Sequence, residues 1–369
     1  MNPIANLKTV PSPALLFDAD AIERNLQLML KTVGGDPAKL RPHIKTHKCR
    51  EILERQLALG IRQVKCATIA EAELSAMAGV PDVLLSYPLV GPNAARFLRL
   101  TDAYPGTTFS TLVDSETALD GFVRSGHAPV SLFIDLDCGM HRTGVAPGKA
   151  VALAKALVAR PELRFAGLHA YDGHIHDAPI EARREQFEAA MAIVDEARAA
   201  IEAEVAPVPL LVSGGSPTFG LHAARCAADP RPRQCSPGTT VLWDCGYGPS
   251  YEDLPFEAAA FLLTRVVSHP GEGQVCVDLG HKAVAAENPI HRRVHFPALP
   301  DAEFVSQSEE HLVLRVADPS ATPVGTELLG VPKHVCPTVA LHQEALIARS
   351  GSVTDEAWKI AARDRRIGI

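Results

Sequence analysis

The chain of 369 residues lacks the features that mark several large classes of protein. No uninterrupted apolar run is long enough to cross a bilayer, and residues 1–10 carry no apolar signal core. We therefore expect a cytoplasmic protein. Clustered basic residues are also missing. With 36 Lys and Arg against 43 Asp and Glu, the formal net charge is -7, which disfavours nucleic acid and anionic membranes as partners.

A disulfide framework is absent as well. The eight cysteines show no C-x-x-C spacing and no dense cluster, so we expect most of them to be reduced, buried thiols. No internal sequence repeat is visible. What remains is an ordinary globular composition, 47% hydrophobic and 21% charged, in a chain long enough for two domains or for one large barrel plus an addition.

The first two thirds of the chain alternate short apolar runs with stretches of helical period. The predicted strands cover residues 40–45, 63–67, 83–86, 109–113, 131–136, 165–170 and 209–212, with a weak eighth around Gln234 or at 241–243. The predicted helices cover residues 70–78, 94–103, 115–125, 148–159 and 180–204. This rhythm predicts an α/β fold, a parallel (β/α)8 TIM barrel over residues 18–245. An open doubly wound sheet is the alternative, but no glycine-rich nucleotide loop follows the first strand.

The pattern changes after residue 245. Alternating segments separated by Gly, Pro, Asn and Asp occupy residues 261–268, 274–279, 303–306, 312–316, 326–329, 339–341 and 344–348. They predict a mostly antiparallel β domain formed by residues 246–369. Residues 1–17 are expected to join it, because 14–17 form a strand-like run before the first helix.

Lys45 is the first candidate for chemistry. It ends the first predicted strand, between two histidines in the run RPHIKTHK from Arg41 to Lys48. A lysine at the carboxyl end of a barrel strand can form a Schiff base with an aldehyde. The alternative is a surface lysine at the start of a helix.

Two glycine- and serine-containing loops follow the last predicted strands. In a barrel, the loops after strands seven and eight often bind phosphate through backbone N–H groups. Ordinary turns contain the same residue types, but two such loops together with a lysine after strand one fit pyridoxal 5'-phosphate, which has an aldehyde and a phosphate. The candidate phosphate contacts are Ser213, Gly214, Gly215, Ser216, Gly238 and Thr239.

Further candidates follow strands five and six. Arg142, in a glycine-flanked turn, is expected to hydrogen-bond the phenolic oxygen of the cofactor, and Tyr171 to pack against its ring. His174 and His176 are candidate proton-transfer residues. Each of the four also has an ordinary interpretation, as a solvated arginine, a tyrosine at the barrel rim or a surface histidine.

His334 and Cys336 are the candidate metal ligands. If their segment is a strand, residues two apart project from one face, and imidazole with thiolate favours zinc, with manganese or magnesium as other possible ions. A buried cysteine beside a structural histidine is the alternative.

Taken together, these residues resemble the D-threonine aldolase and D-serine dehydratase group of pyridoxal-phosphate enzymes, which shares the fold of bacterial alanine racemases. The likeness covers nearly the whole chain. Its motifs are the lysine run at 41–48, ATIAEAE at 67–73, the Arg142 turn, YDGH at 171–174, SGG at 213–215, PGT at 237–239 and HVCPT at 334–338.

The resemblance implies a barrel plus a β domain, a homodimer, Lys45 as the Schiff-base residue, and a metal beside the cofactor held by His334 and Cys336. It implies a lyase acting on small D-β-hydroxy amino acids, most simply a retro-aldol cleavage to glycine and an aldehyde. One position departs from that assignment: such aldolases commonly carry His-x-Asp at the metal pair, and His-x-Cys is more similar to the dehydratases. Dehydration to ammonia and a 2-oxo acid is therefore the alternative. Racemisation and simple carriage of the cofactor fit fewer of the residues.

Overall fold

The computed structural model describes residues 4–123 and 128–369, which form two compact units. The barrel unit contains residues 29–45, 52–238 and 364–369. The sheet unit contains the residues up to 28 together with 46–51 and 239–363. Helices α1 (Ala19–Thr32) and α2 (Arg50–Ala58) each contain residues of both units.

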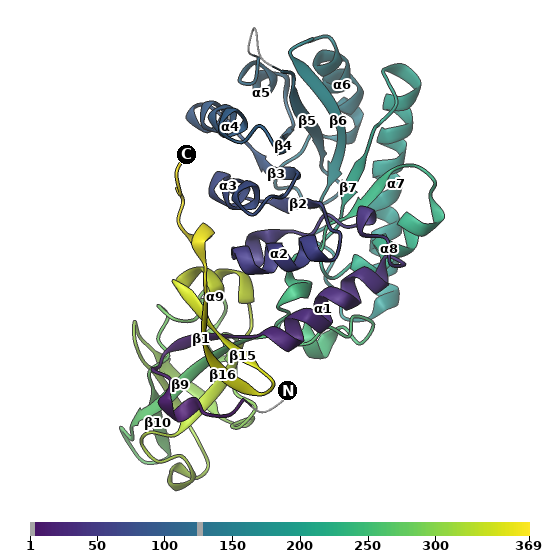
Figure 1. The fold of residues 1–369 in the computed structure, drawn as a ribbon. Coiled ribbons are helices and arrows are strands. Elements are labelled where there is room, and N and C mark those ends of the chain that lie inside the picture. The colour runs from purple at the N-terminus through teal and green to yellow at the C-terminus, as the bar shows by residue number, and fades with distance from the viewer. Residues whose placement is uncertain (1–3, 124–127) are drawn as a thin grey trace. The chain divides into compact units, whose positions relative to one another are not determined.

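The barrel unit is built on a curved, wholly parallel sheet whose strands follow one another in chain order, β2-β3-β4-β5-β6-β7-β8. Helices α3 to α7 lie on the outer side of this sheet (Figure 1). The strands are β2 (Gln63–Cys66), β3 (Asp82–Pro88), β4 (Thr108–Val113), β5 (Val130–Leu136), β6 (Leu163–Ala170), β7 (Leu211–Ser213) and β8 (Arg233–Cys235). The helices are α3 (Ile69–Met77), α4 (Pro92–Ala103), α5 (Glu116–Asp120), α6 (Ala150–Val158), α7 (Ile180–Glu204) and α8 (Phe219–Ala228).

The first predicted strand closes this sheet through single bridges on its two sides. Leu40 bridges Cys235 of β8, and His43 bridges Lys65 of β2, both in parallel. The Arg41 side chain, 1% exposed, donates to both carboxylate oxygens of Asp82 at 2.9 and 2.6 Å. This segment therefore completes the eighth position of the barrel, and the predicted fold class is confirmed.

The apolar runs of the sequence form strands because both faces of the parallel sheet are buried. β5 is buried along its whole length, as expected for a parallel sheet covered on both faces. Leu84, Leu112, Phe133 and Val212, from four different strands, form one buried apolar cluster. The eighth strand contains Gln234; residues 241–243 are not a strand, because a 3-10 turn occupies Thr239–Val241. Residues 124 and 125 of the predicted helix 115–125 lie outside the described residues, and α5 ends at Asp120.

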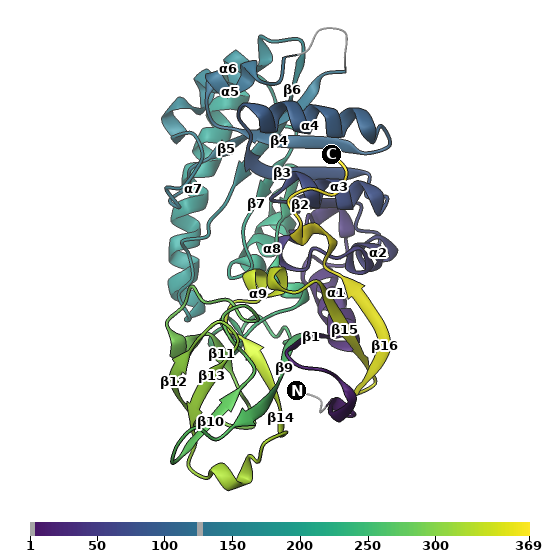
Figure 2. The same cartoon turned by 90° about the vertical axis from the view of Figure 1, so that its left-hand side faces the viewer.

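The sheet unit has the strand order β12-β13-β10-β9-β1-β15-β16, with β14 pairing β9 and β11. Figure 2 shows β1 between β9 and β15, and it pairs β9 antiparallel and β15 parallel. The predicted strand at 14–17 is thus confirmed as an internal strand. The bounds are β1 (Ala14–Asp18), β9 (Ala260–Ser268), β10 (Gln274–Val277), β11 (Val294–His295), β12 (Glu303–Gln307), β13 (Leu312–Arg315), β14 (Glu327–Pro332), β15 (Glu344–Arg349) and β16 (Ser352–Lys359).

The sheet unit also corrects one predicted strand. Residues 339–341 belong to helix α9 (Val335–Leu341). Pro337 falls in the first turn of this helix, where proline is tolerated because its missing N–H would have no partner there. All eight cysteines are free thiols, as expected. Among the described residues, we find no helix with both the length and the apolar character that spanning a membrane requires.

Candidate active site

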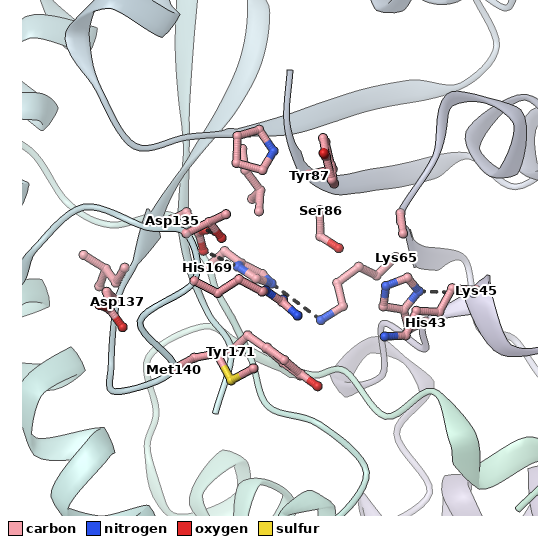
Figure 3. Close-up of a pocket in the computed structure, with 16 residues that line it drawn as sticks. His43, Lys45, Lys65, Ser86, Tyr87, Asp135, Asp137, Met140, His169 and Tyr171 are labelled. Atoms are coloured by element: carbon pink, nitrogen blue, oxygen red, sulfur yellow. Dashed lines mark hydrogen bonds and ion pairs between the residues drawn. The ribbon is translucent and has the colours of Figure 1, made fainter. Parts of the chain in front are cut away.

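A cavity of about 460 Å³ opens at the carboxyl ends of the barrel strands. This is the volume of a small-molecule site, and it lies where (β/α)8 barrels carry their chemistry. Its polar lining comes from β2, β3, β5 and β6 and from the turn after the first strand segment, and Figure 3 shows these side chains converging. Lining residues include His43, Lys45, Lys65, Ser86, Asp135, Asp137, Met140, Arg142, His169 and Tyr171.

Lys45 lies where the sequence predicts, directly after the strand segment that closes the barrel. It is the middle residue of a 3-10 turn, Ile44–Thr46. The backbone N–H of Lys45 donates to Nδ1 of His43 at 3.2 Å. His43 thus fixes the turn that carries the lysine, and both side chains line the cavity.

A second lysine lines the same cavity, and the sequence interpretation missed it. Lys65 lies inside β2 and is 2% exposed. Its Nζ is 3.5 Å from Nε2 of His169, whose Nδ1 is 2.7 Å from Oδ1 of Asp135 (Figure 3). Thr143 donates to the other oxygen of Asp135 at 2.9 Å. One feature of the sequence could have identified Lys65: it is an ionisable residue in the middle of a strand that is buried on both faces.

Burial changes the acid–base behaviour of this lysine. Burial lowers the pKa of Lys65 to about 7, and the positive charge of Lys45 acts in the same direction. The carboxylates of Asp172 and Asp135 oppose this effect only in part. Burial likewise lowers the pKa of His169, although its hydrogen bond to Asp135 acts the other way. A neutral amine and a neutral imidazole can therefore coexist here near pH 7.

Arg142 and Tyr171 face each other in the cavity. The guanidinium carbon of Arg142 is 5.1 Å from the centroid of the Tyr171 ring, and Lys65 Nζ is 5.7 Å from it. The turn before Arg142 is held by Asp137, whose Oδ1 accepts the backbone N–H groups of Gly139 and His141, each at 3.0 Å. Burial would raise the pKa of Asp137, but these donors lower it.

The predicted phosphate loops meet each other within the barrel unit. The N–H of Gly238 donates to Oγ of Ser216 at 3.2 Å, and Ser213 Oγ lies 3.1 Å from Nδ1 of His222. Gly214 has φ +92°, and a Cβ there would lie 2.3 Å from the His222 ring. A Cβ on Gly215 would lie 3.2 Å from the Tyr171 ring. The loops therefore lie beside a cavity-lining tyrosine without lining the 460 Å³ cavity themselves.

His174 and His176 do not line the cavity. Nδ1 of His176 donates to the backbone oxygen of His174 at 2.6 Å. Nδ1 of His174 is buried without a hydrogen-bond partner among the described residues. Their proton-transfer role stays a prediction.

His334 and Cys336 lie on a helix start, which corrects the strand geometry expected for them. His334 is the N-cap of α9, in extended conformation, and Cys336 is in the first turn. Asp244 accepts the Val335 N–H at 3.0 Å and so caps this helix. The two candidate side chains still meet: a hydrogen bond to Cys336 and a second to Glu287, at 2.6 Å, raise the pKa of His334 to about 9. Cys336 Sγ lies 3.1 Å from the Thr46 hydroxyl and 3.9 Å from that of Thr239.

Comparisons with known proteins agree with this architecture. The family model "Alanine racemase, N-terminal domain" matches residues 17–231, and "Putative serine dehydratase domain" matches residues 259–348. A D-threonine aldolase from Arthrobacter sp. is 32% identical, over 97% of this chain and 94% of that protein. A 3-hydroxy-D-aspartate aldolase from Paracoccus denitrificans (strain Pd 1222) is 31% identical, over 96% and 93%. The crystal structure of D-threonine aldolase from Filomicrobium marinum superposes with a TM-score of 0.86 at 31% identity, covering 97% of each chain.

The chain belongs to the D-threonine aldolase and D-serine dehydratase-like family. It has the alanine racemase-like fold of that family and is an enzyme, a pyridoxal-phosphate-dependent lyase.

The side chains of this family member fit the cofactor. A lysine amine, an aromatic ring and a guanidinium share one cavity, and beside it lies a loop whose backbone at Gly214 leaves no room for a Cβ. Such a loop allows backbone N–H groups to approach an anion closely. For a metal the donor set is smaller. In the described part of the chain no group of three or more His, Cys, Asp and Glu side chains is arranged to hold an ion, so His334 and Cys336 offer a pair of ligands.

Proposed function

We propose that this lyase cleaves the Cα–Cβ bond of D-β-hydroxy amino acids, giving glycine and an aldehyde. The observation that carries the proposal is the cavity holding Lys45, Arg142 and Tyr171 at the carboxyl ends of the barrel strands. Whole-length similarity to a D-threonine aldolase and a 3-hydroxy-D-aspartate aldolase supports the reaction type.

The cofactor residues follow from this assignment. Lys45 would hold the aldehyde of the cofactor covalently through its amine, Arg142 would bond its phenolic oxygen, and Tyr171 would pack against its ring. Ser213, Gly214, Gly215, Ser216, Gly238 and Thr239 would supply hydroxyl and N–H donors to its phosphate. Bound pyridoxal phosphate supplies an electron sink for the bond that breaks at Cα.

We also propose that His334 and Cys336 hold a divalent ion, zinc in the first place because one ligand is sulfur. Such an ion lowers the pKa of a hydroxyl bound to it, which assists removal of the β-hydroxyl proton. His334 must then be neutral and Cys336 a thiolate, so ion binding releases protons. The active form is proposed to be a homodimer acting on small D-amino acids in the cytoplasm.

The deciding assay incubates the cofactor-loaded protein with D-threonine and with L-threonine. Acetaldehyde and glycine formed in equal amounts from the D-isomer support the proposal, and EDTA should suppress them. Borohydride reduction before digestion should label Lys45. A protein that forms no aldehyde from D-threonine, D-3-hydroxyaspartate or D-phenylserine is not an aldolase of this kind.

Dehydration is the second candidate, and two observations favour it. Residues 259–348 match a serine dehydratase domain, and the proposed metal pair contains cysteine. In that reaction a basic side chain of the site must remove the proton from Cα while the β-hydroxyl group leaves. The same incubation would then give ammonia and 2-oxobutyrate from D-threonine, so one product analysis separates the two reactions.

A further inference from the structure

Lys65 is an unusual residue for the interior of a barrel. Lysine is rarely buried without a partner of opposite charge, because its ammonium loses hydration. Lys65 is 2% exposed, and within residues 4–123 and 128–369 no ion pair joins it to a carboxylate. Its hydrogen-bond partner is the His169 ring, at 3.5 Å. The fold therefore retains an amine where an apolar side chain would be more stable.

The amine points to where the reaction would occur. Lys65 Nζ and the Lys45 side chain line the same cavity, and Figure 3 shows the Lys65 side chain extending from β2 toward its centre. The ring of Tyr171, which would pack against the cofactor, is 5.7 Å from Lys65 Nζ. The amine is thus among the cavity groups within reach of a small bound substrate.

Behind the amine, two side chains form a chain of hydrogen bonds leading away from the cavity centre. Nδ1 of His169 is 2.7 Å from Asp135 Oδ1, and Nε2 faces Lys65 Nζ. Because Nδ1 carries the proton toward the carboxylate, Nε2 is left to accept from the amine. His169 and Asp135, 4% and 3% exposed, are buried and positioned to hold the Lys65 amine toward the cavity.

The charges that act on Lys65 come from several elements. Lys45, after the first strand segment, and Arg41, within it, disfavour a proton on the amine. Asp135 on β5 and Asp172 after β6 favour one. Because two positive and two negative groups oppose each other, burial decides the direction in which the pKa of Lys65 shifts. Lys65 can therefore exchange a proton at neutral pH instead of remaining protonated.

We propose that Lys65 is the catalytic proton carrier for the α-carbon of the substrate, with His169 and Asp135 as its positioning residues. As a consequence, the enzyme should catalyse a further reaction, the exchange of the α-hydrogen of glycine with solvent in the absence of any aldehyde. This inference rests on the proposed lyase function and deepens it.

The proton balance is simple in both directions. In cleavage, the Cα–Cβ bond breaks and the Lys65 ammonium donates a proton to Cα, which leaves glycine and a neutral amine; pyridoxal phosphate would supply the electron sink for the bond that breaks. The proton lost from the β-hydroxyl balances the one that Lys65 recovers from solvent. In exchange, the neutral amine removes a proton from Cα of bound glycine and, after equilibrating with D₂O, returns a deuteron.

The test follows the α-proton signal of glycine by NMR in D₂O with the cofactor-loaded protein. Lys65→Met keeps the length of the side chain without a titratable group and should slow the exchange at least about 100-fold, the usual contribution of general acid–base catalysis. Lys155→Met is the matched control, since Lys155 is an exposed lysine of the same unit, paired with Glu204. Exchange in Lys65→Met at the rate of Lys155→Met overturns the proposal.

Failure of the inference differs from failure of the proposed function. If the wild-type protein forms no aldehyde, the lyase proposal fails; if it forms aldehyde while Lys65→Met exchanges glycine normally, only Lys65 is excluded. Lys65→Ala with added ethylamine gives a second test. If exchange is restored in proportion to the concentration of unprotonated ethylamine, the result supports proton transfer by Lys65. If ethylamine does not restore exchange in the cofactor-loaded variant, Lys65 has a structural role and the proposal is overturned.

A readout independent of activity uses the cofactor-free protein. The ¹³Cε signal of Lys65, identified by its loss in Lys65→Met, should titrate with a midpoint near 7. His169→Phe removes the imidazole behind the amine and should move the midpoint. A midpoint near the ordinary value of 10.5 in the wild type would show an amine that is protonated throughout the working range, and would overturn the proposal.

Discussion

At the scale of single residues, the buried amine of Lys65 is costly for stability. Because burial lowers its pKa to about 7 from an ordinary value of 10.5, the unfolded chain binds more protons than the folded chain between these pH values. The folded state therefore loses stability as the pH falls through this window. A residue retained at such a cost is a candidate for function.

This cost predicts a pH dependence of stability. In the wild type, Lys65 should raise the free energy of unfolding with increasing pH between about 7 and 10.5, by up to about 1.4 kcal/mol per pH unit. Lys65→Met removes that contribution, so the variant should be the more stable protein at pH 6, and its advantage should shrink toward pH 10. Urea unfolding of the cofactor-free proteins at several pH values measures this, and a difference that does not change with pH contradicts it.

At the scale of elements, the first strand segment is joined to the barrel wall by a single bridge on each side. Arg41 compensates through its two hydrogen bonds to Asp82 and a third, at 2.7 Å, to Gln234. Since Lys45 follows this segment directly, the barrel closure also fixes the position of the proposed cofactor lysine.

Arg41→Met should therefore destabilise the barrel unit. Asp82 is 42% exposed, so water can solvate its carboxylate once Arg41 is replaced. We therefore expect the free energy of unfolding to fall by about 3 kcal/mol, near the lower end of the range for broken buried ion pairs. Lys155→Met breaks the exposed Lys155–Glu204 pair and should cost less than about 1 kcal/mol. Chemical denaturation compares the two, and similar losses would show that Arg41 does not hold the closure.

Helix α9 gives a second prediction for an element. Asp244 accepts the N–H groups of Val335 and Gly246, each at 3.0 Å, and so connects the start of α9 to the preceding turn. Asp244→Ala should cost about 1–2 kcal/mol and weaken zinc binding at His334 and Cys336 about tenfold or more. A competing zinc chelator measures the affinity. Asp318→Ala, which removes an exposed cap of the 3-10 turn Pro319–Ala321, should leave it unchanged.

The strand pattern was predictable because parallel barrel strands are apolar runs of short length, and Lys45 was predictable because it ends one of them. Helix α9 was not: its residues Val339 and Leu341 are β-branched or apolar in a short segment, where helix and strand share the same composition. Lys65 was not predicted because its role depends on His169 and Asp135, which are distant in sequence and meet only in the folded barrel.

At the scale of the whole molecule, the proposed cofactor lysine and the proposed metal pair belong to different units, although Thr239, a proposed phosphate contact, lies in the sheet unit with Cys336. Lys45 belongs to the barrel unit, and His334 with Cys336 to the sheet unit. Each unit has its own buried apolar cluster, Leu84 being a member of one and Leu16 of the other. Loss of one group therefore need not unfold the site for the other.

We expect separate loading of the two groups. Lys45→Ala should lose the covalently held cofactor but keep one equivalent of metal, whereas Cys336→Ala should lose the metal and keep the cofactor absorbance. Metal analysis and absorption spectra of the same preparations provide the measurement. Loss of both groups in either variant would contradict independent sites and indicate that one ligand orders the other.

The position of β1 has a consequence for how the polypeptide matures during synthesis. This strand begins at residue 14, yet one of its two partners, β15, is made of residues 344–349. On the ribosome, the barrel segments 52–238 can collapse early. The amino-terminal strand β1 cannot pair with β15 until nearly all of the chain has emerged. Nascent chains stalled before residue 344 should therefore expose β1 to chaperones and proteases even when their barrel has already formed.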